Sequence, residues 1–355
     1  MPLDQYYLLG RSGLRVSRLA LGTMNFGTGG FHAAYGKTED EVRPIFRKYL
    51  DEGGNFVDTA DFYTAGESET ILGKLIAETG ARDRVVLTTK FTNTVDPADP
   101  NAGGNGRKHM IRALEASLRR LGTDYVDVFL LHTWDRLTPV EEVVRTFDDL
   151  VRAGKIRYPG LSDVPSWYAA RAQTYAEAHS LAPMINLQLP YSLVQREIET
   201  EHVPMGQQLG LGITAWSPLA GGFLTGKYRD GGSGRFSDTD TPWTERDWQL
   251  LKPLEEVAGR LGVTMAQVAI NWVATQPGIA SAIVGASSAE QLGKSMAALD
   301  FEIPAEQRKL LDEASAAAPA SVYRMFTPEY QNWIVSPGLK VGDKPAGYAP
   351  AVRNW

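Results

Sequence analysis

Short apolar runs alternate with longer amphipathic segments along most of the chain. Eight of the apolar runs are nearly continuous, which is typical of parallel strands that are covered on both faces. They are "LALGT" (19–23), "FVDTA" (56–60), "VVLTTK" (85–90), "YVDVFLLH" (125–132), "YPGLS" (158–162), "MINLQLPYS" (184–192), "LGITAWSPL" (211–219) and "ASAIVGAS" (280–287). We predict one strand in each run.

Helical patterns lie between most of these runs. One begins at Thr38, a predicted N-cap with Glu41 three residues later, and ends at Gly53 and Gly54. Another has Pro139 at its predicted first helical position. We predict helices within residues 38–54, 107–122, 138–155, 164–180, 201–210, 265–276 and 289–299.

Eight strands alternating with helices predict an α/β fold, a single (β/α)8 barrel of the TIM type. A doubly wound sheet would carry Gly-x-Gly-x-x-Gly after its first strand, and "GTMNFGTGGF" does not fit that pattern. The early "YYLLGRSGLRVS" predicts a β-hairpin that would close one end of the barrel. We expect one domain over residues 1–355, with the barrel at about 8–300 and a C-terminal extension at about 301–355.

Three segments exceed ordinary loop length, at residues 91–107, 220–245 and 318–355. Long loops in a compact domain commonly carry function, so we expect some of these to border a substrate.

Composition excludes several classes of protein. The 355 residues include no cysteine, which excludes disulfides, thiolate nucleophiles and cysteine-ligated metal sites. The net charge of −6 gives no basic field for nucleic acid. The longest apolar runs contain Pro and Gly and are too short to span a membrane. The N-terminus lacks a signal-peptide pattern, so we expect a cytoplasmic protein.

Polar residues stand at the carboxyl ends of three consecutive predicted strands, where catalytic groups of such barrels lie. Asp58 falls within the second predicted strand and Tyr63 in the loop after it, while Lys90 ends the third and His132 the fourth. Each residue alone has an ordinary structural explanation, such as a cap, a loop aromatic or a solvated lysine. Together at one end of the barrel they indicate an active site.

These residues suit proton transfer to and from a carbonyl group. A phenol has an ordinary pKa of about 10, and the ammonium of Lys90 is expected to lower the pKa of Tyr63. Asp58 would hold Lys90 charged and oriented, and His132 would orient the substrate oxygen. Tyr63 would then be the general acid of reduction and the general base of oxidation. Because no side chain supplies hydride, a nicotinamide cofactor is required.

Two long motifs resemble the signatures of the aldo-keto reductase superfamily. They are "FVDTADFYTAGESETILGKLI" and "GRKHMIRALEASLRRLGTDYVDVFLLHTWD", and the similarity runs from about Leu8 to Leu299. The resemblance implies a catalytic tetrad formed by the four residues above, and a cofactor bound in an extended form without a Rossmann module.

The stretch "HTWDRLTPVEEV" resembles the aryl-alcohol dehydrogenase branch of that superfamily. This suggests that Trp134 lines a substrate pocket with Tyr63 and His132. Packing of Trp134 beneath the 91–107 loop is an equally good alternative. Sugars, aromatic aldehydes and polyketide or toxin carbonyls all stay open as substrates.

The resemblance also implies contacts to the cofactor. "AWSPLAGGFLTGKY" is a close match to the family, and it implies Trp216 stacked on the nicotinamide. "GLSDVPSW" has Asp163 where relatives usually have Asn, and an aspartate cannot donate to the carboxamide oxygen. The expected contacts are Gly22, Thr23, Met24, Asp58, Ser162, Asp163, Gln188, Trp216, Ser217, Leu219, Gly221, Lys227, Arg235, Gly285, Ser287, Gln291, Lys294 and Ser295.

The adenosine end of the cofactor decides between NADP(H) and NAD(H). Many relatives carry Arg at position 287 and Asn at position 295, where this chain has Ser287 and Ser295. The segment resembles the "GAS-x-AEQL" form of potassium-channel β subunits, which are similar to NADP-binding reductases without that Arg. Ser287, Gln291 and Arg235 would then contribute to binding the 2′-phosphate, which favours NADP(H) and leaves NAD(H) open.

The leading hypothesis is an oxidoreductase that interconverts small-molecule aldehydes or ketones and alcohols. The alternative from another class is an NADP-binding regulatory protein of the potassium-channel β-subunit type with little turnover, and the intact tetrad favours the enzyme. A metal-dependent hydrolase needs clustered ligands, yet only His132 of the five histidines ends a predicted strand, so no metal is expected. The direction of the reaction and homo-oligomerisation stay open.

Overall fold

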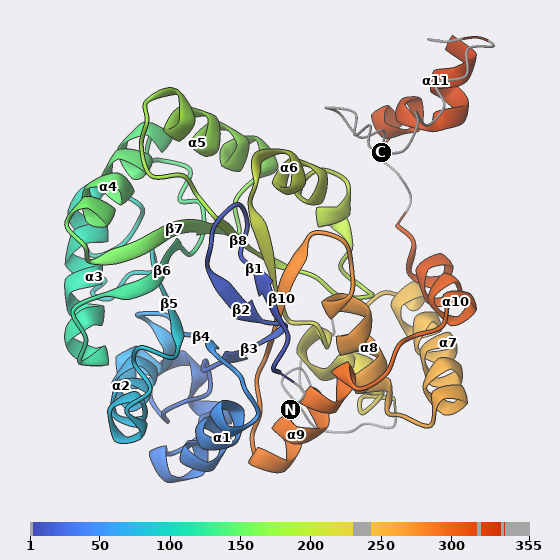
Figure 1. Ribbon diagram of the computed structural model, residues 1–355, viewed down its shortest axis with the longest axis horizontal. Helices are drawn as coiled ribbons and strands as arrows, with labels where there is room; N and C mark the ends of the chain where they lie inside the picture. The colour runs from blue at the N-terminus through green and yellow to red at the C-terminus, as the bar shows by residue number, and fades with distance from the viewer. Residues whose placement is uncertain (1–2, 230–242, 318–320, 335–336, 338–355) are drawn as a thin grey trace. The chain divides into compact units, whose positions relative to one another are not determined.

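The computed structural model describes residues 3–229, 243–317, 321–334 and 337. Eight parallel strands close into a barrel in the order β10-β3-β4-β5-β6-β7-β8-β9 (Figure 1). They are β3 Leu19–Gly22, β4 Phe56–Asp58, β5 Val86–Phe91, β6 Val126–Leu131, β7 Ile156–Ser162, β8 Asn186–Pro190, β9 Gly212–Trp216 and β10 Ile279–Val284. Each overlaps one predicted run, so the predicted (β/α)8 barrel is confirmed.

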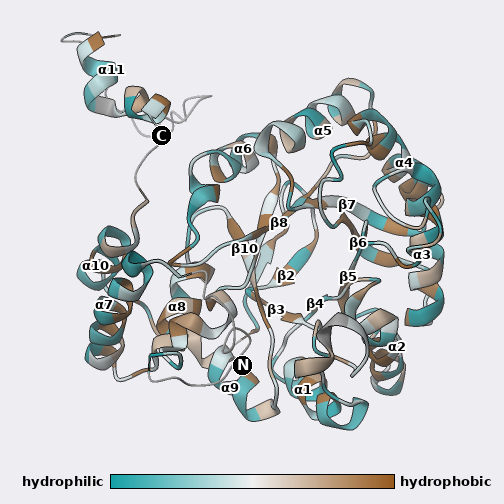
Figure 2. Ribbon diagram, turned by 180° about the vertical axis from the view of Figure 1, so that it is seen from behind, coloured by the Kyte–Doolittle hydropathy of each residue, from teal (hydrophilic) through white to brown (hydrophobic). Residues whose placement is uncertain are grey.

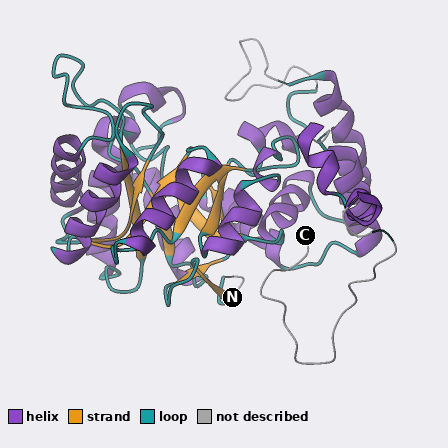
Figure 3. Ribbon diagram, turned by 90° about the horizontal axis from the view of Figure 1, so that it is seen from above, coloured by secondary structure: helices purple, strands orange, loops and turns teal. Residues whose placement is uncertain are grey.

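Helices surround the strands on all sides, as Figure 3 shows with helices in purple and strands in orange. They are α1 Glu39–Asp51, α2 Glu67–Thr79, α3 Arg107–Leu121, α4 Val140–Arg152, α5 Ser166–Ala178, α6 His202–Leu209, α7 Glu245–Leu261, α8 Met265–Ala274, α9 Ala289–Met296 and α10 Ala305–Ser315. Within the described ranges, none of the helices has the length and apolar character that crossing a bilayer would require.

The predicted helices are all present, with small differences at their ends. The Thr38 capping box is confirmed, because the backbone N–H of Thr38 donates to Glu41 Oε2 at 2.8 Å. Pro139, predicted as the first helical residue, is instead the N-cap of α4, which begins one residue later at Val140. Helices α2, α7 and α10 lie outside the predicted helices, although Leu72 and Leu75 of α2 show a buried apolar face at helical spacing.

The predicted N-terminal hairpin is also confirmed. Strands β1 Tyr6–Leu8 and β2 Arg15–Ser17 pair antiparallel. Leu9 and Val16 are fully buried and belong to a core cluster with Phe56 and Ile185, from the amino ends of the barrel strands. The hairpin therefore closes the end of the barrel opposite the strands' carboxyl ends, and Figure 1 shows it across the centre of the ring.

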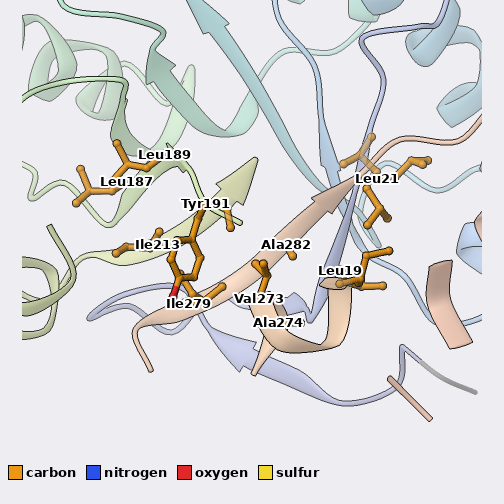
Figure 4. Close-up of a cluster of buried hydrophobic side chains, with 14 of the residues drawn as sticks. Leu19, Leu21, Leu187, Leu189, Tyr191, Ile213, Val273, Ala274, Ile279 and Ala282 are labelled. Atoms are coloured by element: carbon orange, nitrogen blue, oxygen red, sulfur yellow. The ribbon is translucent and has the colours of Figure 1, made fainter. Parts of the chain in front are cut away.

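The main core lies between the barrel strands and the helices. Figure 4 shows part of it, where Ala282 of β10 lies beside Val273 of α8 and Leu189 lies beside Leu187 on β8. Burying a leucine or isoleucine side chain stabilises a fold by about 1.5–3 kcal/mol. The outer helix faces are largely hydrophilic in Figure 2, as expected for helices with one face on a barrel.

The chain divides into two compact units, Met1–Ser315 and Ala316–Trp355. The first holds the barrel, the hairpin and α10. The second contains the 3₁₀ turn Ser321–Phe326 and α11 Pro328–Ile334, in which the rings of Tyr330 and Trp333 lie 5.7 Å apart. Of the long loops, residues 92–106 have no helix or strand, whereas the loop after β9 contains the 3₁₀ turn Ala220–Thr225.

Helices α2 and α3 approach closely at Gly73, and this packing generates a prediction. A β-carbon at position 73 would lie 2.5 Å from the carbonyl oxygen of Leu121. Gly73→Ala should therefore lower the free energy of unfolding by about 1–3 kcal/mol, because the helices must separate. Urea denaturation would measure it.

Gly259 in α7 is the matched control, because a β-carbon there would meet nothing within 4 Å. Gly259→Ala should raise the free energy of unfolding by about 0.5–1 kcal/mol through better helix propensity. Equal effects at the two glycines would show that α2 and α3 do not pack as described.

Candidate active site

A buried lysine stands at the centre of the strands' carboxyl ends. Lys90 of β5 is fully buried, and its Nζ donates to Asp58 Oδ2 of β4 at 2.7 Å. It also donates to the carbonyl oxygen of Thr59 at 2.7 Å and to the hydroxyl of Tyr63 at 3.2 Å. Tyr63 opens the 3₁₀ turn η2 Tyr63–Gly66 directly after β4. The structure thus brings three of the predicted catalytic side chains into direct contact.

His132 completes the group. It follows β6, and its backbone N–H donates to the carbonyl oxygen of Phe91 at 2.9 Å. Its ring centroid lies 5.9 Å from that of Tyr63, nearly perpendicular to it at 75°. The four residues that the sequence placed at one end of the barrel therefore lie together.

Two residues that sequence reasoning missed help to fix His132. Thr92 has a φ of 127°, and its Oγ1 accepts from the backbone N–H of His132 at 3.1 Å. The same hydroxyl donates to Asn105 Oδ1 at 2.6 Å, and both side chains are buried. Thr92 and Asn105 lie within a predicted loop, where no periodic pattern marks a buried polar pair.

Burial changes the expected acidity of the site. Burial tends to lower the pKa of Lys90, but the charge of Asp58 and the hydrogen bonds outweigh it and raise that pKa above its ordinary value. For Tyr63, burial raises the pKa, and the opposing charge of Lys90 does not fully offset it. The net direction is thus opposite to the sequence-based expectation. The phenol is protonated at neutral pH and able to donate.

Asp58 is held on both sides. Its Oδ2 accepts from Lys90, and its Oδ1 accepts from Gln188 Nε2 of β8 at 2.7 Å. The backbone N–H of Thr23 donates to the carbonyl oxygen of Asp58 at 2.9 Å. Gln188, one of the expected cofactor contacts, therefore donates an amide N–H to Asp58, which leaves its oxygen able to accept from a ligand.

Polar groups at the ends of β7 and β9 suit a planar amide. Ser162 Oγ is buried and makes no hydrogen bond within the described residues. Asp163 next to it has a φ of 46°, and its Oδ1 accepts from Trp216 Nε1 at 3.0 Å. Burial raises the pKa of Asp163 to about 6, against the hydrogen bond from Trp216 and the charge of Lys90. An unpaired hydroxyl beside an anchored indole fits a nicotinamide ring with its carboxamide.

The loop after β9 is shaped for an anion. Ser217, Gly221 and Gly222 have φ values of 58°, 63° and 95°, and Ser217 Oγ accepts from the backbone N–H of Gly221 at 3.1 Å. A β-carbon at Gly222 would lie 3.0 Å from Lys227 Nζ, so the ammonium lies against this loop. Leu219 stands between these residues. Left-handed backbone with a nearby cation is typical of phosphate-binding loops.

The segment after β10 presents small polar groups to solvent. Both the backbone N–H and the hydroxyl of Ser287 donate to Gln291 Oε1 at 2.7 Å. A β-carbon at Gly285 would meet nothing within 4 Å. Lys294 is paired with Glu290 at 2.6 Å on the exposed face of α9, and Ser295 is buried. Arg235 lies outside the described residues.

Residues after β3 contact the neighbouring strands. A β-carbon at Gly22 would lie 2.7 Å from Ile283 Cγ2 of β10, so glycine allows close strand packing there. Thr23 is buried with its hydroxyl 2.8 Å from that of Ser68, and Met24 is half-buried. These positions border Asp58.

Trp134 lies in an aromatic group at the start of α5. Its ring centroid is 5.3 Å from that of Trp167 and 6.1 Å from that of Tyr168. The guanidinium of Arg136 lies 5.9 Å above its ring. The indole is half-buried and lies two residues after His132, so its assignment to a substrate pocket stays a prediction.

A second buried acidic group lies on the same strand-to-loop segment as the tetrad. Asp61 is 3% exposed, and its backbone N–H donates to the carbonyl oxygen of Lys90 at 3.1 Å. Burial raises the pKa of Asp61 to about 8, and the charge of Glu69 adds to this. Glu69 is itself buried and paired with Arg120 at 2.7 Å. Asp61 is therefore largely protonated at neutral pH.

This raised pKa generates a prediction for stability. Between pH 5 and pH 8 the folded state keeps a proton on Asp61 that the unfolded chain loses near pH 4, so stability falls as pH rises. In Asp61→Asn this loss should be absent, which reduces the fall in unfolding free energy over that range by roughly 3 kcal/mol. Urea denaturation at both pH values measures it.

Asp51→Asn is the control, because Asp51 is exposed at the end of α1. That variant should keep the wild-type pH dependence. If Asp61→Asn also keeps it, Asp61 is ionised in the folded protein.

Comparison with known proteins identifies the family of the chain. Residues 18–316 match the model of the aldo/keto reductase family. The chain is 37% identical over 319 residues to a Bacillus subtilis (strain 168) protein named "Uncharacterized oxidoreductase YrpG", covering 87% of this chain and 95% of that protein.

Two other relatives have more specific names. A Schizosaccharomyces pombe protein named "Putative voltage-gated potassium channel subunit beta" is 35% identical over 333 residues, covering 89% of this chain and 95% of that protein. "Norsolorinic acid reductase stcV" of Emericella nidulans is 34% identical over 303 residues, covering 83% of this chain and 77% of that protein. With the family model matched across most of the barrel and relatives similar over nearly their whole length, the chain belongs to the aldo/keto reductase family of oxidoreductases.

Proposed function

We propose that the protein uses NADP(H) to interconvert aldehydes or ketones and alcohols, with Tyr63 as the general acid and base. The observation that carries this is the contact of Lys90 Nζ with both Asp58 and the hydroxyl of Tyr63. A buried phenol next to an ammonium is a proton donor whose conjugate base is stabilised where it forms. A bound nicotinamide supplies the hydride.

The four residues have separate roles in reduction. Tyr63 donates its proton to the carbonyl oxygen of the substrate, and the resulting phenolate is stabilised by Lys90, 3.2 Å away. Asp58 keeps Lys90 charged, since the folded protein raises the pKa of that ammonium. His132, beside Tyr63, orients the substrate oxygen. In oxidation the same groups act in reverse, with Tyr63 accepting the proton.

Residues along the strand ends would hold the cofactor. Ser162, Asp163 and the oxygen of Gln188 would contact the carboxamide, and Trp216 would stack on the ring. The pyrophosphate would be held by Ser217, Leu219, Gly221 and Lys227. The backbone of this loop is left-handed, and the ammonium of Lys227 lies against it. Ser287 and Gln291 would face the adenosine. The family relationship supports NADP(H) over NAD(H), and the exposed helix start at Ser288 suits a phosphate of either cofactor.

A second candidate is a regulatory protein that binds NADP(H) with little turnover. It is supported by the similarity to proteins named as potassium-channel β subunits. The relative named "Norsolorinic acid reductase stcV" supports an enzyme that reduces a small molecule instead. A titration of NADPH fluorescence combined with turnover of a panel of carbonyl compounds separates the two: tight binding without turnover would favour the regulator.

Replacing the proton donor should stop the chemistry and spare binding. Tyr63→Phe is expected to reduce kcat for carbonyl reduction by about 10²–10⁴-fold, the usual contribution of a general acid, while the Kd for NADPH changes little. Stopped-flow absorbance at the reduced nicotinamide band gives the rate.

Tyr125→Phe is the matched control, because it removes a phenol from the start of β6 at the other end of the barrel. That variant should keep wild-type turnover. Unchanged turnover in Tyr63→Phe would remove Tyr63 from the role of proton donor.

A new cation at position 287 should alter the choice of cofactor. Ser287 is exposed next to the N-cap of α9, so an arginine there can reach a 2′-phosphate. Ser287→Arg is expected to tighten binding of NADPH about tenfold relative to NADH, as measured by fluorescence titration of both. An unchanged ratio would mean that this segment does not face the adenosine.

A further inference from the structure

Asp163 is a carboxylate that takes no part in the proposed proton transfer. It follows β7 in a left-handed conformation, with a φ of 46°. Its Oδ1 accepts from Trp216 Nε1 at 3.0 Å, and its backbone N–H donates to the carbonyl oxygen of Gln188 at 3.2 Å. The carboxylate is therefore fixed between β7, β8 and β9, on the side where the nicotinamide is proposed to lie.

The groups around Asp163 leave its charge only partly compensated. Lys90 of β5 acts on it electrostatically, but that ammonium is already paired with Asp58 at 2.7 Å. Tyr63 feels the negative charge of Asp163 and is neutral at physiological pH. His132 follows the adjacent strand β6, and the two groups bonded to Asp163, the Trp216 indole and the Gln188 carbonyl, carry no charge. A net negative potential therefore results beside the indole.

We propose that Asp163 is a specificity-determining residue that makes the site bind the oxidised cofactor more tightly than an asparagine would, without a matching effect on the reduced cofactor. The proposal rests on the proposed function, because it requires the nicotinamide to lie against Trp216. It concerns the relative affinities of the site for the oxidised and the reduced cofactor, which membership of the family does not fix.

The physical reason is the charge of the nicotinamide ring. The oxidised ring is a cation and the reduced ring is neutral, so a nearby carboxylate attracts only the first. Asparagine has the same shape and can still accept from Trp216 Nε1 through its oxygen. It also gains an N–H donor for the carboxamide, but that carboxamide is present in both forms. The ratio of the two dissociation constants therefore isolates the charge.

The test is Asp163→Asn, with the dissociation constants of NADP⁺ and NADPH measured by intrinsic tryptophan fluorescence. We expect Kd for NADP⁺ divided by Kd for NADPH to increase roughly tenfold, which corresponds to about 1.4 kcal/mol. Glu177→Gln is the charge-matched control, because Glu177 is exposed near the end of α5. That variant should keep the wild-type ratio.

A second measurement uses the wild-type protein and does not depend on a variant. Asp163, with a pKa raised by burial to about 6, loses its charge as pH falls. The preference for NADP⁺ should therefore decrease between pH 7 and pH 5.5. Protonation of the cofactor 2′-phosphate affects both forms alike and cancels in the ratio. Imidazoles titrate in the same pH range. Asp163→Asn keeps His132 and therefore serves as the reference. In that variant the preference for NADP⁺ should change less between pH 7 and pH 5.5.

The outcomes separate this proposal from the proposed function. If neither NADP⁺ nor NADPH binds to the wild-type protein, both the proposed function and the inference about Asp163 are wrong. If both bind and Asp163→Asn leaves their ratio within about twofold of wild type, only the inference is wrong. A roughly tenfold increase of Kd for NADP⁺ over Kd for NADPH in Asp163→Asn, with the ratio unchanged in Glu177→Gln, supports the inference, and a decrease overturns it.

Discussion

The structure of the site depends on one buried cation. A fully buried ammonium is costly unless its donors and charge are satisfied, and Lys90 has three oxygen partners in Asp58, Thr59 and Tyr63. Asp58 and Thr59 lie at the end of β4, and Tyr63 opens the 3₁₀ turn that follows. Since Lys90 is the penultimate residue of β5, the ion pair fixes the relative positions of two neighbouring strand ends and of the phenol beside them.

The same constraint extends around the barrel. Asp58 also accepts from Gln188 of β8, which lies across the ring from β4 in the strand order. The carboxylate thus links opposite strands through the barrel mouth. The hairpin and its apolar residues close the other end, so the polar groups converge at the carboxyl ends of the strands, where the cofactor and the substrate are proposed to bind.

Burial then decides the charge of each group. It keeps Tyr63 protonated despite the adjacent ammonium, raises the pKa of Asp61 to about 8 and raises that of Asp163 to about 6. Three acidic side chains within one region therefore have three different protonation ranges. This distribution leaves a neutral phenol beside the ammonium of Lys90 and a separate carboxylate beside Trp216, and the proposed discrimination between cofactor forms rests on that carboxylate.

The sequence by itself determined the eight strands, the hairpin and the placement of Asp58, Tyr63, Lys90 and His132 at one end of the barrel, because continuous apolar runs and strand-terminal polar residues are local patterns. The tertiary structure alone decided that Gln188 pairs with Asp58, that Thr92 and Asn105 hold His132, and that burial outweighs Lys90 in setting the pKa of Tyr63. These facts depend on distances between segments and on exclusion of water, which no spacing along the chain encodes.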